Sequence, residues 1–494
     1  TTFNNIHHLD FLAGYEIDDT YNDYLSGEAY NFTTPDKHAI SNGMKTVSVG
    51  GSDSRYRLVS YLSRLNYDYK NKYYLGASFR VDGSSRLHRD NRWGTFWSVS
   101  GAWRTIEEEF MQPVKDWLTD LRIRASYGVN GTLPSDYFGY MGLSSISGGY
   151  LEQPGIQMSQ IANPNLKWET NYNMNIGLDF GFWDRLNFTI EYYTRTTKNL
   201  LMDCPVSMTT GFSSYLMNIG EVKNKGIELT INSTNIKIKD FNWNTTFNLG
   251  HNSNKVVKLD GEQTQIVSGT QIHKVGSSYR TFYVQEFAGI NPETGNPLFY
   301  TNELDENGNY IKEITENSKN AQFIPYKHAE PTVNGGISNS LRYKWLDLNF
   351  LFSYQFGGYS YDTWAQKTEH GGYDSYANIP TYYRDSWKKP GDQTNIEVYM
   401  PGKSSSVSMH KITSSRRIHS TDYFRLKNIT FGITLPKEWT NKINIGNVRF
   451  YASASNLWTW AAYDNYDPEA VSAGSATQTT PPLKTVTFGL NINF

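Results

Sequence analysis

The sequence predicts an all-β protein, an antiparallel transmembrane β-barrel, and three observations lead to this prediction. Apolar and polar residues alternate with period two along most of the 494 residues. The connections between the predicted strands alternate between short and long. Aromatic residues make up 15% of the chain, yet no run approaches the ~18 consecutive apolar residues of a membrane helix. A helical membrane protein is therefore excluded.

The strands follow from the period-two pattern. In residues 168–182, for example, Met174, Ile176 and Leu178 alternate with asparagine or glycine. We expect about fourteen strands with boundaries uncertain by ~2–4 residues, near 7–18, 54–69, 72–82, 93–104, 119–130, 168–182, 186–199, 224–238, 241–254, 333–344, 346–358, 421–435, 445–459 and 482–494.

The lengths of the connections favour a barrel over a soluble sandwich. Turns of about three residues follow the second, sixth, eighth and tenth strands, as is usual for the periplasmic side of an outer-membrane barrel. We expect residues 1–494 to form one part of such a barrel. Its long extracellular loops would lie near 19–53, 131–167, 200–223, 255–332, 359–420 and 460–481.

Composition narrows the function. Lys plus Arg number 46 and Asp plus Glu 48, so the chain lacks the basic excess of a nucleic-acid-binding protein. The single cysteine, Cys204, rules out an internal disulfide framework and a cysteine-based metal cluster. The histidines do not have metal-ligand spacing, and no nucleophile elbow, phosphate loop or zinc motif occurs. We therefore expect no enzyme activity, no cofactor and no metal site.

One acidic segment requires a choice between two interpretations. Residues 305–309 (DENGN) carry closely spaced oxygen ligands, which calcium prefers. The segment lacks the glycine and the closing glutamate of an EF-hand loop, and Asn-Gly is a strong turn signal. We therefore favour a turn.

The polar strand faces would line the lumen of the barrel. We expect these side chains to point into the lumen: Arg122, Arg124, Asn173, Asn175, Asp179, Asn491 and Asn493.

Aromatic residues in two of the long loops are the candidates for substrate binding. Rings beside hydrogen-bonding groups suit stacking on sugar faces or clamping of an extended peptide. The alternative is that the rings pack on one another, because a loop this long needs its own small core. The candidates are Tyr359, Tyr361, Trp364, Tyr373, Tyr382, Arg384, Trp387 and, at the entry of the last loop, Trp458.

The C-terminal strand resembles the signal that outer-membrane assembly machinery reads. Its apolar positions are Phe488, Leu490, Ile492 and the final Phe494. The alternative is an ordinary edge strand that ends in phenylalanine.

Several phrases resemble the SusC-like (RagA-type) TonB-dependent outer-membrane transporters of Bacteroidetes. They occur in the order of that family and include 80–86 (RVDGSSR), 163–170 (NPNLKWET), 218–229 (NIGEVKNKGIEL), 289–297 (GINPETGNP), 422–429 (DYFRLKNI), 455–457 (SNL) and 466–469 (YDPE). The resemblance implies a barrel of about 22 strands around an N-terminal plug. It also implies energy from the TonB–ExbB–ExbD complex and a SusD-like surface lipoprotein as a lid.

We expect the chain to depart from that family pattern, with no carboxypeptidase-like N-terminal domain, no TonB box, no plug and only about fourteen strands. We expect it to be the C-terminal barrel part. A plug-bearing N-terminal segment or a second chain would complete the barrel, because open sheet edges are unstable in lipid. The competing possibility is that fourteen strands close on themselves.

These observations predict the barrel part of an active importer of oligomeric nutrients, glycan or peptide. Its predicted location is the outer membrane of a Gram-negative, Bacteroidetes-like cell. Its predicted partners are a SusD-like lipoprotein, the plug-bearing segment, the TonB complex through that segment, and outer-membrane lipid, without nucleic acid. Two alternatives are a soluble or surface-attached β-protein that binds glycans and a self-closed passive pore.

Overall fold

A computed structural model describes residues 1–4, 6–37, 39–150, 153–259, 264–373, 378–402, 409, 411–443, 445–476 and 479–493. The chain is almost entirely β-structure, which confirms the predicted fold class. It divides into two compact units, which we describe separately. Unit 1 comprises residues 1–103, 124–174 and 195–221, and unit 2 comprises residues 104–123, 175–194 and 222–494.

Unit 1 is built on long antiparallel strands that follow one another in the chain. Four long strands pair in sequence order: β2 (His7–Phe32), β3 (Gly43–Tyr69), β4 (Tyr73–Ser84) and β5 (Trp93–Trp103). The two-residue strand β1 (Thr2–Phe3) pairs with β2. The unit also holds two hairpins, β7 (Leu143–Tyr150) with β8 (Gln153–Gln160) and β11 (Leu201–Pro205) with β12 (Ser214–Asn218). Strands β6 (Leu118–Thr132), β9 (Glu169–Phe182) and β10 (Leu186–Lys198) contribute residues to both units.

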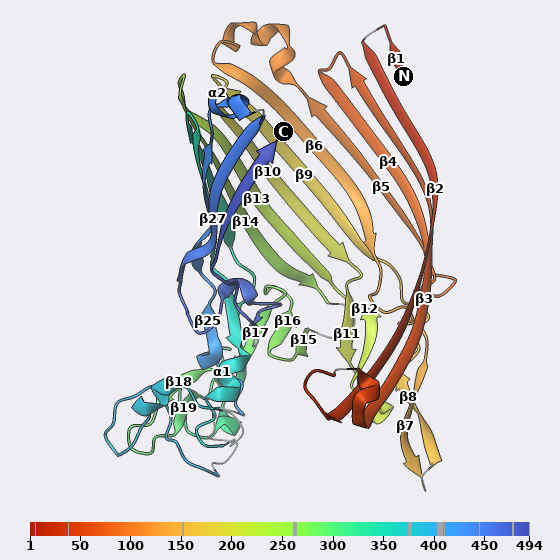
Figure 1. Cartoon of the computed structure of the whole chain (residues 1–494). Coiled ribbons are helices and arrows are strands. Elements are labelled where there is room, and N and C mark those ends of the chain that lie inside the picture. The colour runs from red at the N-terminus through yellow and green to blue at the C-terminus, as the bar shows by residue number, and fades with distance from the viewer. Residues whose placement is uncertain are drawn as a thin grey trace. The chain divides into compact units, whose positions relative to one another are not determined.

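Unit 2 continues the same design with antiparallel neighbours (Figure 1). Its long strands pair in this order: β13 (Glu221–Lys237), β14 (Phe241–Lys258), β22 (Val333–Tyr343), β23 (Leu346–Phe356), β26 (Tyr423–Thr434), β27 (Asn447–Ala461) and β29 (Thr485–Asn493). Each of the fourteen predicted strands therefore exists, and β1 is added to them.

Tight turns join neighbouring strands where the sequence predicts them. Lys70 and Asn71 between β3 and β4 have φ of +55° and +52°, and Trp183 and Asp184 between β9 and β10 have φ of +50° and +54°. Left-handed backbone at both central residues matches the right-handed twist of the flanking strands. These turns fix the register, and with it the face on which each side chain lies.

Rings pack across glycines on neighbouring strands. A Cβ atom on Gly335 of β22 would lie 2.1 Å from the carbonyl oxygen of Asn248 and 2.5 Å from Oη of Tyr354. The Tyr354 hydroxyl donates a hydrogen bond of 2.8 Å to that same carbonyl oxygen. Only glycine allows the ring to lie this close to the backbone of the adjacent strand.

One predicted loop is largely strand. The sequence predicts a loop over 19–53, but β2 continues to Phe32 and β3 begins at Gly43. The pairing between β3 and β4 starts only at Leu58, so in the described residues the segment 43–57 pairs with β2 alone. We call residues 19–57 the β2–β3 ribbon. At ~3.3 Å per residue it extends roughly 50 Å past the last pair of β3 and β4.

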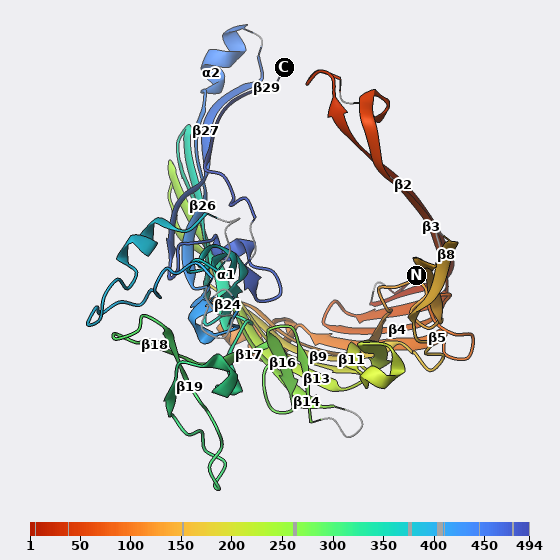
Figure 2. The ribbon, with the colours of Figure 1, turned by 90° about the horizontal axis from the view of Figure 1, so that it is seen from below.

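The other predicted loops fold into short elements of their own, because backbone groups in a long loop need hydrogen-bond partners. Their strands are β15 (Gln265–Ser268), β16 (Gln271–Lys274), β17 (Thr281–Gln285), β18 (Phe287–Ile290), β19 (Pro297–Tyr300), β20 (Ile314–Thr315), β21 (Phe323–His328), β24 (Tyr359–Asp362), β25 (Ile418–Ser420) and β28 (Ser475–Ala476). Seen from below, β17, β24 and α1 lie close together (Figure 2).

The helices are short. The two α-helices of the described residues are α1 (Thr363–Thr368) and α2 (Lys437–Thr440). The 3₁₀ helices are η1 (Ile40–Asn42), η2 (Thr105–Glu107), η3 (Glu109–Val114), η4 (Met208–Thr210), η5 (Ser318–Asn320), η6 (Thr381–Asp385), η7 (Ser415–Arg417), η8 (Asn441–Ile443) and η9 (Pro468–Ala470). No helix within the described ranges is long and apolar enough to cross a membrane.

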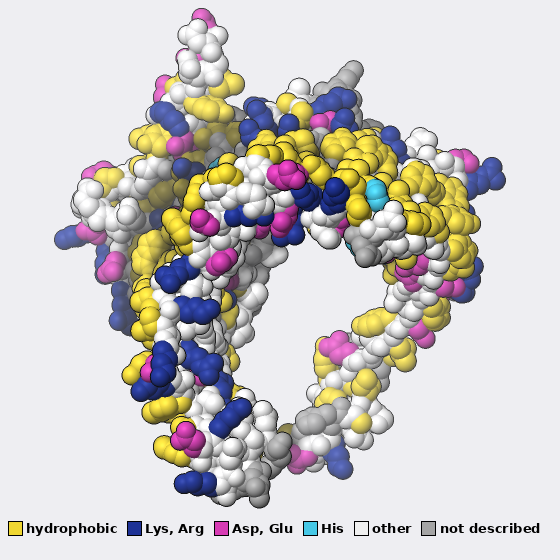
Figure 3. Space-filling view, turned by 90° about the horizontal axis from the view of Figure 1, so that it is seen from above, with side chains coloured by type: hydrophobic (Ala, Val, Ile, Leu, Met, Phe, Trp, Pro, Cys, Tyr) yellow, Lys and Arg dark blue, Asp and Glu magenta, His cyan; other side chains and the backbone are white. Residues whose placement is uncertain are grey.

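The loops of unit 2 have two small cores. Phe282, Val284, Tyr361 and Ile418 form the first, and Phe299, Ala321, Met409 and Ile412 form the second. The long strands, in contrast, keep many large apolar side chains exposed, such as Phe488 at 81%. Seen from above, hydrophobic side chains gather in contiguous groups (Figure 3).

Candidate functional site

The candidate site lies in unit 2, where three short strands meet. β24 pairs antiparallel with β25 and parallel with β28, which joins the loop 359–420 to the loop 460–481. Asp362 ends β24 and caps helix α1, because its Oδ1 accepts a hydrogen bond of 2.7 Å from the backbone N–H of Ala365. This cap fixes the start of α1 and, with it, the position of Trp364.

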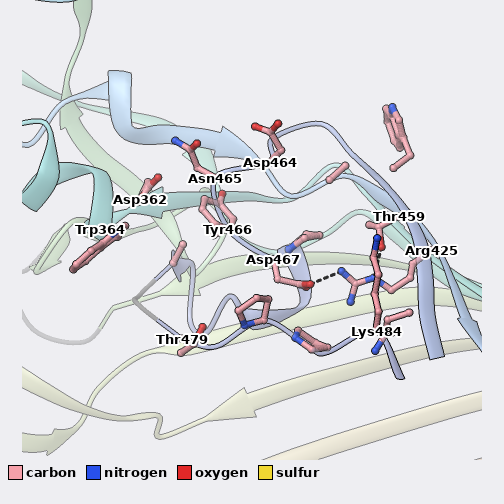
Figure 4. Close-up of a pocket in the computed structure, with 17 residues that line it drawn as sticks. Asp362, Trp364, Arg425, Thr459, Asp464, Asn465, Tyr466, Asp467, Thr479 and Lys484 are labelled. Atoms are coloured by element: carbon pink, nitrogen blue, oxygen red, sulfur yellow. Dashed lines mark hydrogen bonds and ion pairs between the residues drawn. The ribbon is translucent and has the colours of Figure 1, made fainter. Parts of the chain in front are cut away.

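A cavity of about 700 Å³ lies beside these strands. Arg425, Thr459 and Lys484 stand at one end of it, Asp362 and Trp364 at the other, with Tyr466 and Asp467 between them (Figure 4). A second cavity of about 280 Å³ adjoins it. The two cavities share Asp362, Trp364 and Asn465 in their walls. The two cavities are therefore neighbours, and Trp364 borders both.

Arg425 on β26 is the centre of a charge network. Its side chain is 3% exposed and forms an ion pair of 2.5 Å with Asp467 and a second one with Glu469. Its Nε donates a hydrogen bond of 2.9 Å to Oγ1 of Thr459. Lys427, two residues further along β26, contacts Glu469 at 2.9 Å. The network fastens the segment around η9 to the wall of the cavity.

A second network fastens the other end of the cavity. The Tyr463 hydroxyl donates a hydrogen bond of 3.0 Å to Oδ2 of Asp362, and the Tyr463 ring stacks on His419 with ring centroids 3.7 Å apart. Burial lowers the pKa of His419 to about 4, against the effect of Asp362, which raises it. His419 is therefore a neutral stacking partner at neutral pH. The Tyr466 hydroxyl contacts Oγ of Ser360.

A buried ion pair lies at the C-terminal end of α1. Arg417 is 1% exposed and forms an ion pair with Glu369, which also accepts a hydrogen bond from the Tyr382 hydroxyl. Burial lowers the pKa of Arg417 to about 10. Arg417 thus stays charged at neutral pH.

The structure brings two of the predicted substrate-binding residues to the cavities. Trp364 lies in the wall of both and is 39% exposed, and Tyr382 lies in the wall of the smaller one. Tyr361 is 1% exposed and belongs to a loop core, against which Tyr359 also packs. The self-packing interpretation therefore applies to Tyr359 and Tyr361, whereas substrate binding by Trp364 and Tyr382 stays a prediction.

The remaining candidates lie elsewhere in the same loops. Trp387 donates a hydrogen bond of 2.7 Å to the carbonyl oxygen of Pro292, and the Tyr373 ring lies below the ammonium of Lys411. Arg384 is exposed. Trp458 packs edge-to-face on Phe424, with ring centroids 6.2 Å apart.

Of the residues that line the larger cavity, the sequence identified Trp364 as a binding candidate and missed the polar ones, among them Arg425, Asn456, Asp464, Tyr466, Asp467 and Lys484. The phrases at 422–429 and 466–469 carry part of the signal, since they contain Arg425 and Asp467. Their pairing across the cavity was not predictable from either phrase alone.

Two further predicted features can be placed. Phe488, Leu490 and Ile492 lie on one exposed face of β29, and Phe494 lies outside the described residues.

Asp305 closes a turn, because its Oδ1 accepts hydrogen bonds from the backbone N–H groups of Asn307 (2.9 Å) and Asn309 (2.8 Å). The hydrogen bonds from Asn309 contribute most to lowering the pKa of the Asp305 carboxyl. Together with the other hydrogen bonds of the turn, they hold it below its usual range. Within the described ranges, no group of three His, Cys, Asp or Glu side chains is arranged to hold a metal ion.

The predicted lumen residues form polar ladders. Arg122 and Asp179 form an ion pair of 2.9 Å, and the Asn175 amide donates a hydrogen bond of 3.0 Å to Glu191. The Asn173 amide donates one of 2.6 Å to Asn130. These contacts join polar side chains of neighbouring strands on the face opposite the apolar one.

Comparison with known proteins identifies relatives of the whole chain. TonB-dependent receptor P3 of Formosa agariphila is 32% identical over 99% of this chain and 51% of its own length. TonB-dependent receptor SusC of Bacteroides thetaiotaomicron is 30% identical over 96% of this chain and 47% of its own length. The chain thus spans about half the length of the curated relatives it matches.

Solved structures agree with this relationship. The RagAB peptide transporter matches 100% of this chain and 54% of its own chain, with a TM-score of 0.87 at 27% identity. The RagAB peptide importer in its open-open state matches with a TM-score of 0.85. The relatives are receptors and transporters rather than enzymes, as the sequence predicts, and the resemblance to SusC-like transporters is confirmed. Residues 1–303 match the family model "TonB dependent receptor-like, beta-barrel", and the chain belongs to that family.

Proposed function

We propose that the chain forms part of the barrel wall of an outer-membrane importer that takes up oligomeric nutrients, glycan or peptide, with energy from TonB. The likeness to the RagAB peptide transporter over 100% of this chain carries the proposal. The match covers this chain throughout, at 27% identity and with a TM-score of 0.87.

Exposed apolar side chains support a location in the outer membrane. On β4, Leu75 and Phe79 are 60% and 50% exposed, and on β29 Phe488 and Leu490 are likewise exposed. A water-soluble protein rarely exposes contiguous apolar surface on this scale. Lipid would cover it, as in barrels with apolar-out, polar-in alternation. Relatives from Formosa and Bacteroides support a Bacteroidetes-like cell.

The polar ladders support a path for polar cargo. Arg122, Asp179 and Asn175 already satisfy much of their hydrogen-bonding capacity with neighbouring strands. A hydrated lumen lined in this way can conduct a polar oligomer without leaving buried charges unpaired. The cavities at the loops would capture the cargo before it enters.

The proposed partners follow from the relatives. A SusD-like surface lipoprotein would cover the loops, and a plug-bearing segment would complete the barrel and connect it to the TonB complex. The relatives are about twice as long as this chain, which leaves room for such a segment in the full assembly.

The test is uptake in cells with and without TonB, combined with gentle detergent extraction and mass spectrometry of co-purifying proteins. We expect energy-dependent accumulation of an oligomeric nutrient, loss of accumulation without TonB, and recovery of a lipoprotein and a plug-bearing polypeptide. Uptake that persists without TonB would establish a passive pore instead. Extraction as a monomer without detergent would establish a soluble protein.

A further inference from the structure

We propose that the apolar face of β13 and β14, at the end where these strands meet the long loops, binds the phosphate headgroup of a membrane lipid. This inference rests on the proposed function, because it requires that lipid covers the apolar face. Three observations lead to it: two lysines lie opposite each other, no acidic side chain of the described residues pairs with them, and the lysines border an apolar surface.

The register of β13 and β14 follows from hydrogen bonds between polar side chains on one face of the sheet. The Asn254 amide donates a hydrogen bond of 2.7 Å to Asn224. Side-chain hydrogen bonds of 3.0 and 2.8 Å repeat the same register further along both strands. This register places Lys223 directly opposite Lys255. Because successive side chains of a strand point to opposite faces, both lysines lie on the other face, away from the asparagines.

That other face carries a group of lysines at the long-loop end of the two strands. Lys223 of β13 and Lys255 of β14 form a cross-strand pair, and Lys225 lies two residues further along β13. All three are exposed, and we call them the lysine cluster. Like charges directly opposite each other destabilise a sheet. A bound anion would remove this repulsion.

The protein itself does not neutralise the lysine cluster. Within the described ranges, none of its three members forms an ion pair, and Glu221, which precedes them on the same face of β13, pairs with Lys198 at 3.9 Å. A neighbouring turn adds positive charge. A Cβ atom on Gly276 would lie 4.0 Å from Cε of Lys255, and this turn carries the exposed Lys274. Phosphate, with up to two negative charges, suits several lysines at once.

The lysine cluster borders an apolar surface. Ile227, which is 47% exposed, follows Lys225 on the same face of β13, and Leu229 comes next, opposite Leu249 of β14. At ~3.3 Å per residue, Lys225 lies roughly 7 Å from Ile227 along the strand. Lysines at the border of an apolar surface keep their ammonium groups on its polar side. A lipid has the same arrangement, with a charged headgroup beside apolar chains, whereas a free phosphate ion would use the lysines alone.

Lipid binding by the full-length protein, purified with its partners in an uncharged detergent, tests the proposal. The probes are diphosphoryl lipid A, dioleoylphosphatidylcholine, whose headgroup has no net charge, and inorganic phosphate. Native mass spectrometry measures binding, and the midpoint of heat-induced unfolding measures stabilisation, because a ligand that binds only the folded state raises it. We expect lipid A to bind and to raise the midpoint, and the other two probes to do neither.

A double variant with a matched control locates the binding. Lys223→Gln combined with Lys255→Gln should weaken lipid A binding about twenty-five-fold, since each lysine near an anionic lipid surface contributes about a fivefold gain in affinity. Lys388→Gln combined with Lys389→Gln removes two exposed lysines from the loop 359–420 and should leave binding unchanged.

The unfolding midpoint without lipid separates a ligand site from a structural role. The double variant at 223 and 255 lacks the repulsion between the two lysines, so without lipid it should unfold at the same temperature as the parent or higher. With lipid A the order should reverse, because only the parent keeps the full set of phosphate contacts.

Equal affinity of the parent and the double variant for lipid A would overturn the proposal. So would equal stabilisation by inorganic phosphate or dioleoylphosphatidylcholine, or a lower midpoint of the double variant without lipid. Uptake experiments separate this failure from failure of the proposed function. TonB-dependent uptake without lipid A binding would overturn only the lipid site, whereas lipid A binding with TonB-independent uptake would overturn only active import.

Discussion

Arg425 and Asp467 lie 42 residues apart in the chain, and their side chains meet at 2.5 Å. The ion pair joins a strand of the wall to the segment that enters η9. It is almost completely buried, and the second partner of Arg425, Glu469, lies on the same segment. The pair therefore sets the position of the loop 460–481 above β26, and it shapes one end of the larger cavity.

Replacing Arg425 by methionine should release this loop. Removal of one member of a buried pair typically costs about 3–5 kcal/mol, because the remaining carboxylates lose their partner. We expect faster cleavage within 462–476 by an added protease, measured by mass spectrometry. Lys344→Met, which breaks the exposed contact of 4.0 Å with Asp240, is the control and should cost less than about 1 kcal/mol. Equal cleavage in the two variants would contradict the assigned role of Arg425.

Acidification should loosen the stack of His419 on Tyr463. Burial lowers the pKa of His419 from 6.5 to about 4, so the unfolded segment binds a proton more readily than the folded one. The stability it contributes is thus complete above pH 6.5, falls by about 1 kcal/mol per pH unit below that, and is lost towards pH 4. Hydrogen exchange of residues 418–420 between pH 7.5 and 4.5, corrected for intrinsic rates, measures this loss. His419→Phe retains a stacking ring without a titrating group and should show a weaker pH dependence.

Adding a methyl group at Gly335 should disrupt the sheet. The new Cβ of Gly335→Ala would lie 2.1 Å from a backbone oxygen, so a strand must shift. Overpacking of this kind typically costs about 1–3 kcal/mol. The midpoint of heat-induced unfolding in detergent, followed by circular dichroism, should fall by several degrees. Gly101→Ala, whose nearest contact would be an ordinary 3.7 Å to Leu75, should unfold within about one degree of the parent.

Neighbouring residues on β29 should meet different solvents. Leu490 lies on the apolar face of the strand and Asn491 on the other. In native membranes, Asn491→Cys should react with a charged maleimide that does not enter lipid, provided that this reagent is given access to the water inside the barrel. Leu490→Cys should react only with a maleimide that dissolves in lipid. Cys204 is replaced by serine in both variants. The reverse labelling pattern would place the asparagine face in lipid and remove the support for a polar lumen.

The sequence predicts the strands well and the site poorly. The strands follow from local patterns, since alternation in segments such as 168–182 and turn residues such as Lys70 and Asn71 act over a few residues. The β2–β3 ribbon was missed because polar and glycine-rich stretches such as 42–54 resemble loop sequence, although they extend a hairpin whose register is already set.

The site depends on contacts between distant segments. Asp362 meets Tyr463 across 101 residues and Ser360 meets Tyr466 across 106. Composition could identify the aromatic loop, but it could not tell that Tyr361 turns into a core while Trp364, three residues later, lies at a cavity. The left-handed backbone of Asn456 lies where the pairing of β26 and β27 shifts register. No local sequence pattern predicts this shift.

The β2–β3 ribbon should open locally more easily than the rest of unit 1. A two-stranded hairpin in water is marginally stable, because only one row of hydrogen bonds holds it and neither face is covered. Asp19 at its base, paired with Arg55 at 2.5 Å and Arg57 at 3.0 Å, adds only solvent-exposed charge contacts. The outer part of the ribbon should therefore open and close many times while β4 and β5 stay intact. A partner that supplies a third strand along residues 20–32 would give this outer part of the ribbon a second row of hydrogen bonds. Binding of such a partner would slow amide hydrogen exchange in these residues.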